Sequence, residues 1–440
     1  MLILFYASAA WALTWTEKVI YAHAASESVE SIAIGAAFES FWITYEVVGS
    51  GGLHRLFVVS YVPATGVLGT PILVASNTLN TKMSPSIATD GNGDIHLLYT
   101  DSVMIDDPAT VPVEGCSQPA LPSGPTTEPG RLMHALVDPT PAVPTVTIDT
   151  VVNSVVCTNY GKKSTYFDSA DSQLHACWTA KRFTSNDDEV RCSDLALPGT
   201  TWTSIEQVTG PWNDDGFSED HAAVHADAVT GEVRRIWHTD ASGSDVVNLE
   251  TFRPSGVPLS FNMVFSKATS RIDNPTVITR FNGGGFALAF GEDGNKVMFA
   301  DCPAGDALTC SSGSAWTQWN GTAVVPEQVV GGTLNRFADL TAGAQAKPRY
   351  WVNWENDGTE QVGVAYKCNS ASVWTIEDPS AGTDPEVNDR RGTPHIARHV
   401  RFAVPSSTDD IGIVFRRETA TGKHDAILVW ANDGSLAACP

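Results

Sequence analysis

SPSIATDGNGDIHLLYTD (residues 84–101) is the clearest copy of a pattern that recurs seven times in this 440-residue chain. Each copy has a short apolar run, a turn or polar connection, and a segment that ends in an aromatic residue. These segments are FWITY (41–45), IHLLY (95–99), LHACW (174–178), VRRIW (233–237), FALAF (286–290), YWVNW (350–354) and IGIVF (411–415). A repeat of this size, made of strand-like segments alone, predicts an all-β fold: a seven-bladed β-propeller with four-stranded blades.

The two ends of the chain fit together in this interpretation. The seventh unit stops after its third strand, whereas LTWTEKVIY (13–21) has the Trp-Thr start of a fourth strand. We therefore expect residues 13–440 to form one propeller in which the N-terminal strand closes the last blade and removes an exposed edge. The longest connection, residues 102–130 in the second blade, is either a lid over a site or a surface loop fixed by a disulfide.

Composition restricts the class of protein. The net charge of −23 repels phosphate backbones, so nucleic acid is not an expected partner. No run of 18 apolar residues is present, which argues against a helical membrane span. Residues 1–12, MLILFYASAAWA, have the apolar run and small residues of the end of a secretory signal. We therefore predict a secreted protein, extracellular or periplasmic.

The eight cysteines support the same compartment. None lies in a CxxC motif, so disulfides are a better interpretation than a zinc ribbon or a haem site. The blade map makes four pairs neighbours, and we predict these bonds: Cys116–Cys157, Cys177–Cys192, Cys302–Cys310 and Cys368–Cys439.

Residues 84–101, their six weaker copies and the Trp-Thr strand starts resemble the sialidase-like, BNR-repeat type of seven-bladed propellers. The resemblance covers nearly the whole chain and implies the fold. The Asp-box of that family, Ser-x-Asp-x-Gly-x-x-Trp, has at best a remnant in SSGSAW (311–316), and the Arg-Ile-Pro motif of sialidases is absent. The resemblance therefore does not imply sialidase activity.

Polar residues that break the repeat at one end of the blades are the candidates for a site. They lie where the first strand of a blade starts and its second strand ends, and there the connecting loops of closed β folds commonly bind ligands. The catalytic candidates are His221, His238, His395, Tyr166 and Glu355, and the substrate-binding candidates are Arg336, Asn274, Asp101, Glu292 and Arg416. Structural or solvated roles are the alternative for each of them.

This mixture of side chains suits a glycan. Carboxylates bind hydroxyls or act as acid and base, imidazole and phenol move protons, and arginine pairs with acidic sugar groups. The sequence thus predicts a secreted propeller that binds or cleaves an extracellular glycan. If it is an enzyme, a glycoside hydrolase or polysaccharide lyase is expected. The alternative is a non-catalytic, lectin-like or structural module.

No cofactor and no metal ligand set are expected. Asp90, Asn92 and Asp94 have a spacing that resembles a calcium loop, but a hairpin turn explains DGNGD (90–94) better. A structural calcium ion stays an alternative there. The sequence carries no signal for an oligomeric state.

Overall fold

The computed structural model describes most of the chain. The described residues are 13–77, 83–102, 130–140, 143–152, 158–182, 188–203, 205–208, 218–227, 231–241, 244–252, 258–268, 272–279, 286–292, 296–302, 327–331, 335–342, 349–356, 361–368, 373–377, 379, 395–400, 409–418, 423–436 and 439. Within them the strands form seven antiparallel sheets, so the fold is all-β as predicted.

The first four sheets follow one another along the chain. Sheet 1 contains β2 (Ser28–Ala37), β3 (Ser40–Val48), β4 (His54–Val62), β5 (Val67–Leu68) and β6 (Ile72–Asn77). Sheet 2 contains β7 (Ser86–Thr89), β8 (Ile95–Ser102), β9 (Gly130–Asp138) and β10 (Thr145–Val152). Sheet 3 contains β11 (Thr158–Asp168), β12 (Gln173–Arg182), β13 (Asp188–Ala196) and β14 (Glu206–Gln207). Sheet 4 contains β15 (Ser218–Ala226), β16 (Val233–Ala241), β17 (Ser244–Phe252) and β18 (Pro258–Ala268).

The last three sheets include the N-terminal strand. Sheet 5 contains β19 (Ile272–Thr279), β20 (Phe286–Glu292), β21 (Lys296–Cys302) and β22 (Glu327–Gly331). Sheet 6 contains β23 (Asn335–Ala342), β24 (Arg349–Asn356), β25 (Gln361–Cys368) and β26 (Thr375–Glu377). Sheet 7 contains β27 (His395–Val400), β28 (Asp409–Glu418), β29 (His424–Asn432) and β1 (Thr16–Tyr21). Two short 3-10 turns, η1 (Ser50–Gly52) and η3 (Asp433–Ser435), complete the described elements.

The N-terminal strand pairs where the sequence predicts. Strand β1 lies antiparallel to β29, with Thr16 opposite Trp430 and Tyr21 opposite Ala426. The backbone N–H of Leu13 and the indole N–H of Trp15 donate hydrogen bonds to the Glu377 carboxylate in sheet 6, at 3.2 and 2.6 Å. The N-terminal segment therefore covers the edge of β29 and is also attached to the preceding sheet.

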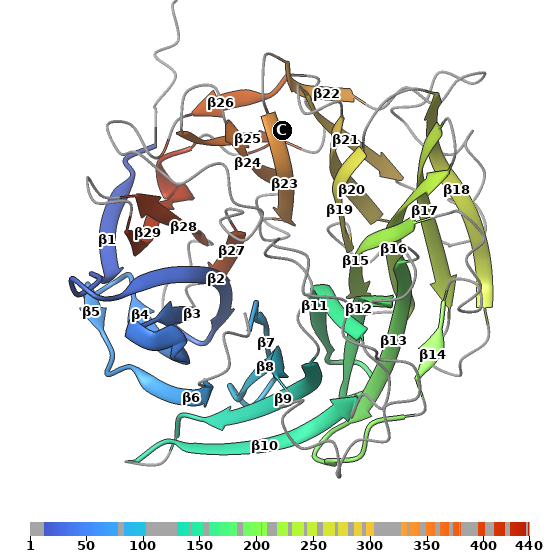
Figure 1. The fold of residues 1–440 in the computed structure, drawn as a ribbon. Coiled ribbons are helices and arrows are strands. Elements are labelled where there is room, and N and C mark those ends of the chain that lie inside the picture. The colour runs from blue at the N-terminus through green and yellow to red at the C-terminus, as the bar shows by residue number, and fades with distance from the viewer. Residues whose placement is uncertain are drawn as a thin grey trace, which may run out of the picture.

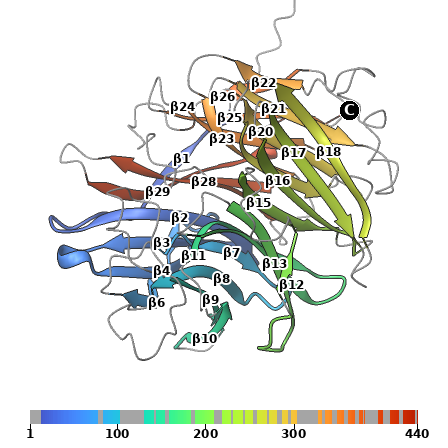
Figure 2. The same ribbon diagram turned by 45° about the vertical axis from the view of Figure 1, so that its right-hand side comes forward.

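Consecutive sheets touch through their first strands. Strand β2 contacts β7, and contacts then follow in order through β11, β15, β19 and β23 to β27, which contacts β2 again. Figure 1 shows the sheets succeeding one another around a common centre, with the first-strand edges inward, and Figure 2 shows the same ribbon turned by 45°. The order of contacts thus returns to its starting point.

The aromatic residues of the repeat form the core between neighbouring sheets. Tyr45, Tyr99, Trp178, Trp237, Phe290, Trp354 and Phe415 are all buried. Trp354, for example, packs with Phe299 in a cluster that joins sheets 5 and 6. A Cβ at Gly363 would lie 2.3 Å from the Trp354 ring, so the close packing of this indole requires glycine on β25. These seven residues, which we call the aromatic column, are therefore part of the core.

Each sheet has two ends. The hairpin end is where the first strand turns into the second strand, and the entry end is where the first strand begins and the second strand ends. The predicted site residues were assigned to the entry end.

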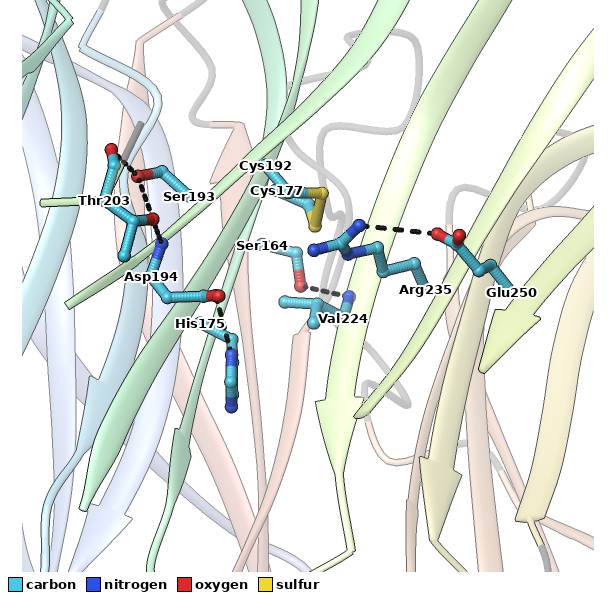
Figure 3. Close-up of a disulfide and its surroundings, with 10 residues drawn as sticks. All are labelled: Ser164, His175, Cys177, Cys192, Ser193, Asp194, Thr203, Val224, Arg235 and Glu250. Atoms are coloured by element: carbon cyan, nitrogen blue, oxygen red, sulfur yellow. Dashed lines mark hydrogen bonds and ion pairs between the residues drawn. A yellow bond between two sulfur atoms is a disulfide. The ribbon is translucent and has the colours of Figure 1, made fainter. Parts of the chain in front are cut away.

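Two of the four predicted disulfides are present. Cys177 and Cys192 are register partners on β12 and β13, and Figure 3 shows the bond between them. Their S–S distance is 2.02 Å. Cys368 at the end of β25 bonds to Cys439, which ties the last residues of the chain to sheet 6. The pairs Cys116–Cys157 and Cys302–Cys310 include residues outside the described ranges, as do the predicted signal segment 1–12 and nearly all of the 102–130 insertion.

Candidate functional site

A buried polar residue follows the column aromatic in six of the seven second strands. Because these strands occupy equivalent places, the polar residues form a belt at the entry end. We call it the polar belt, and it comprises Glu46, Thr100, Thr179, His238, Glu355 and Arg416, with Gly291 in sheet 5. From sheet 1 to sheet 7 the belt reads Glu, Thr, Thr, His, Gly, Glu and Arg, so its polar groups do not repeat regularly from sheet to sheet.

The first strands are bulged at the same level. In sheets 4, 5 and 6 two residues of the first strand lie opposite one column aromatic of the second strand. His221 is in the bulge of β15, Asn274 is in that of β19, and Arg336 is the last paired residue before that of β23. Bulges are frequent next to active sites because they redirect side chains.

The register joins bulged strands to the polar belt. Arg336 on β23 is the direct partner of Glu355 on β24, and Asp220 on β15 is the partner of His238 on β16. Glu355 and His238 are buried, with 1% and 7% of their surfaces exposed. Two of the predicted acid–base residues are therefore enclosed in the protein interior.

The side chains of His221, Asn274, Arg336 and His395 are outside the description, although the backbone of each is placed. His395 is the first residue of β27, opposite Val414, which precedes the column aromatic Phe415. These four residues thus belong to first strands of four consecutive sheets. The backbone of all four lies toward the entry end.

The other substrate-binding candidates have protein partners. The guanidinium of Arg416, fully buried, donates a hydrogen bond to the Val29 carbonyl of sheet 1 at 3.3 Å. Glu292 is buried at the end of β20, with Lys296 Nζ 3.9 Å from its carboxylate. Asp101 is partly exposed and lies 3.6 Å from the Arg131 guanidinium.

Tyr166 is at the other end of its strand. The sequence places it at a strand start, but β11 begins at Thr158, and Tyr166 pairs with His175 close to the hairpin. Its ring lies 3.8 Å from that of His225 on β15, centroid to centroid. Burial lowers the pKa of His225 to about 3, with the charge of Arg234 adding to the effect, so this imidazole is neutral. The structure therefore separates Tyr166 from the other candidates.

Glu46 shows how a belt residue is held. Its carboxylate accepts hydrogen bonds from Ser31 Oγ at 2.6 Å, His54 Nδ1 at 2.6 Å, and the backbone N–H groups of Met83 at 2.9 Å and Ser84 at 3.3 Å. Burial favours the neutral acid, but the bonds from His54, Ser31 and Met83 outweigh it and lower the pKa of Glu46. This carboxylate joins sheet 1 to the start of sheet 2.

A buried lysine adjoins that network and was missed from the sequence. Lys163 follows the bulge of β11, and its Nζ donates a hydrogen bond to the Ser84 carbonyl at 3.4 Å. Burial lowers the pKa of Lys163 to about 7, against the opposing effect of the Glu46 charge. Its place in the middle of a long first strand gave no signal that the amine would be enclosed by two neighbouring sheets.

At the hairpin end, His175 lies between two carboxylates. Its Nδ1 is 2.7 Å from Asp194 on β13, and its Nε2 is 4.0 Å from Asp168. Figure 3 shows the His175–Asp194 pair on the strands that bear the Cys177–Cys192 bond, with Arg235 and Glu250 in the next sheet. Burial acts to lower the pKa of His175, but the two carboxylates outweigh it and raise the pKa.

The DGNGD segment forms the hairpin between β7 and β8. Asp90 accepts hydrogen bonds from the backbone N–H groups of Asn92 and Asp94, both at 2.9 Å, and Gly93 has a φ of +85°. The turn explains these residues without an ion. Among the described residues no group of three or more metal-ligating side chains occurs, and no helix is long and apolar enough to cross a membrane.

Comparisons with known proteins concern the fold. No protein-family model matches the sequence, and no curated protein does. A Trypanosoma rangeli sialidase in complex with sialic acid is similar in structure, with a TM-score of 0.50 and 10% identity over 95% of this chain and 59% of that chain. At that identity the likeness shows a sialidase-like fold alone, and this chain spans about 59% of the trypanosomal protein.

Two further solved structures have TM-scores of 0.48. One is the Hadza microbial sialidase Hz136, with 9% identity over 90% of this chain and 74% of that chain. The other is a protein of unknown function from Dyadobacter fermentans, with 10% identity over 94% of this chain and 97% of that chain.

Proposed function

We propose that the chain is a secreted seven-bladed β-propeller that binds an extracellular glycan bearing an acidic group at the entry end of sheets 4 to 7. The observation that supports it most is the coincidence of bulge and polar belt in sheets 4 and 6. There His221 and Arg336 on the first strands adjoin His238 and Glu355 on the second strands.

The two layers have different roles in this proposal. Residues of the bulged first strands, His221, Asn274 and Arg336, contact the glycan, because the first strands line the centre of the molecule. Residues directly opposite on antiparallel strands put their side chains on the same face. Glu355 would then orient the Arg336 guanidinium, and His238 would orient the groups at the β15 bulge.

Arg336 is the reason for proposing that the glycan bears an acidic group. A guanidinium binds a carboxylate or sulfate through two parallel hydrogen bonds, which neutral hydroxyls cannot reproduce. The overall charge of −23 opposes acidic ligands at long range. Affinity for an acidic glycan should therefore rise with ionic strength up to the point at which the short-range pair is itself screened.

The bound glycan could also be cleaved at this site, by one of two reactions. With His221 or His395 as base and acid, a uronate-containing chain is broken by β-elimination, and with carboxylates as acid and base it is hydrolysed. The burial of Glu355 and His238 favours instead a lectin-like module, in which the same first-strand residues bind without turnover. Unsaturated products indicate a lyase, and new reducing ends alone indicate a hydrolase. If neither product forms, the protein is a binding module.

The test is a glycan array followed by binding titration of the strongest ligand. We expect uronate-, sialate- or sulfate-containing glycans to bind, and Arg336→Gln to weaken binding at least about tenfold. Arg191→Gln is the matched control, since Arg191 is an arginine of the third strand of sheet 3 that pairs with Glu189. Equal affinity of Arg336→Gln and wild type, at equal thermal stability, would overturn the proposal.

A further inference from the structure

Two buried histidines of sheet 2 share one hydrogen bond. Nδ1 of His96 on β8 lies 3.0 Å from Nε2 of His134 on β9, and the rings stack at 5.2 Å with 11° between their planes. Exposure is 0% for His96 and 3% for His134, so water does not solvate either ring. Such a contact needs a hydrogen atom on one of the two nitrogens and a lone pair on the other.

Neighbouring groups limit the protons that the pair can hold. Nδ1 of His134 is 2.7 Å from the Asp149 carboxylate on β10, which accepts, so this nitrogen bears a hydrogen. Nε2 of His96 has no hydrogen-bond partner among the described residues and lies 3.9 Å from Asp90 Oδ2. One extra proton fits in either of two places. On Nε2 of His96 it leaves the His96 Nδ1–H donating to His134. On Nε2 of His134 it makes that nitrogen the donor, and the hydrogen of His96 then lies on Nε2. A second extra proton puts hydrogens on both facing nitrogens and breaks their bond.

The pair also connects sheet 2 to sheet 3. Asp149, which accepts from His134, accepts a second hydrogen bond from the indole N–H of Trp202 at 3.2 Å. The Trp202 ring meets the His134 ring edge-on, 5.4 Å between centroids. Trp202 pairs in a bridge with Leu195 of sheet 3. A displaced His134 ring therefore disturbs the outermost strand β10 and its contact with the next sheet together.

We propose that His96 and His134 form an acid-sensitive latch, which holds β10 and Trp202 together when the pair has at most one extra proton and releases them when a second enters. Charged groups facing the pair are Asp90 and Asp94 in the hairpin turn and Asp149 on β10, with Asp138 farther along β9 near Asp94. Their negative charge retains the first proton, whereas repulsion between two imidazolium rings at this separation opposes the second.

The direction of the effect agrees with the burial of His134. Burial lowers the pKa of His134 and outweighs the attraction of Asp149. A base whose pKa is lower in the folded protein than in the unfolded chain binds fewer protons when folded. Its contribution to stability is complete above the unfolded-state pKa of about 6.5 and is lost progressively as the pH falls below it.

The first test is amide hydrogen exchange on the whole protein from about pH 8 to about pH 5, corrected for intrinsic exchange. We expect opening of β10, relative to β20 as an internal reference, to increase by up to about tenfold per pH unit once the second proton enters. His96→Gln should abolish this increase, because the pair can then hold no second imidazolium. His175→Gln, at the equivalent position of sheet 3, is the matched control and should retain it. An unchanged β10:β20 ratio in wild type, or the same acid response in His96→Gln, overturns the latch.

A second measurement avoids the variants. In protein labelled with 15N-histidine, the latch predicts that the ring nitrogens of His96 and His134 take up their second proton at the pH at which the Trp202 indole N–H signal shifts. Uptake of that proton with no change at Trp202 overturns the proposal, even if the histidine variants fail to fold.

Discussion

Glu46 in sheet 1 and Glu355 in sheet 6 occupy the same place in the repeat, and each is buried directly after a column aromatic. Glu46 is bound by two side chains and by two backbone N–H groups at the start of the next sheet. Glu355 instead has Arg336 as its register partner, on a bulged first strand. Equivalent position therefore does not imply equivalent role: one carboxylate joins sheets, and the other is proposed to support a ligand contact.

The largest effect on stability should come from changing Glu46, the carboxylate that joins sheets 1 and 2. Glu46→Gln replaces one of the two acceptor oxygens by an NH2 group. That group then faces either the Ser31 and Ser84 donors or the His54 and Met83 donors, depending on which oxygen it replaces. Leaving such groups unpaired in the interior costs about 3–5 kcal/mol of unfolding free energy. Urea denaturation measures this cost, and acid should reproduce part of it, since a carboxylate with a lowered pKa stabilises above its unfolded-state pKa and less as pH falls.

Glu355→Gln is the matched comparison. We expect a smaller loss of stability than in Glu46→Gln, together with weaker binding of the acidic glycan, because the change would release the Arg336 guanidinium from its orientation. If both changes destabilise the protein equally and Glu355→Gln leaves glycan binding unaltered, then Glu355 joins sheets as Glu46 does and has no role in the proposed site.

The sequence pattern predicts only part of this contrast. The period of the apolar segments predicted the column Tyr45 to Phe415, the pairing of residues 13–21 with the last sheet and two disulfides. Period-two alternation carries no mark of an inserted residue, so the bulges at His221 and Asn274 were not foreseen. The true start of β11 was missed for the same reason, and Tyr166 was therefore put at the wrong end. His96 and His175 are both buried, and their polar partners lie on other strands, which the pattern within one strand does not reveal.

Lys163 is a buried charge next to Glu46, and removing it should raise the free energy of unfolding, whereas removing the Glu46 charge should lower it. Its folded-state pKa of about 7 lies well below its usual value, so the folded protein binds fewer protons than the unfolded chain between about pH 7 and about pH 10.5. Stability from this group thus rises with pH across that interval, and the full cost of burying the charge is present below it. Lys163→Met should stabilise by about 1–3 kcal/mol at neutral pH, less the lost bond to Ser84.

The gain should shrink as the pH rises toward about 10.5, because above that pH the amine is neutral in both states. Urea midpoints of wild type and variant at several pH values measure it. A gain that is independent of pH would mean that packing, rather than charge burial, makes the difference.

The smallest effect concerns the residue that lies between Glu46 and Lys163. Ser84 has a φ of +40°, in the left-handed region that favours glycine, while its N–H is held by Glu46 and its carbonyl by Lys163. Ser84→Gly relieves this strain and should stabilise by about 0.5–1 kcal/mol, whereas Ser84→Ala, which keeps a Cβ, should not. If the Glu46 bonds impose the conformation, Ser84→Gly gains nothing when Glu46→Gln is already present, and a double-mutant cycle measures the difference. Additive effects would show that the backbone adopts this turn without Glu46, and the carboxylate would then bind a loop start that is already formed rather than shape it.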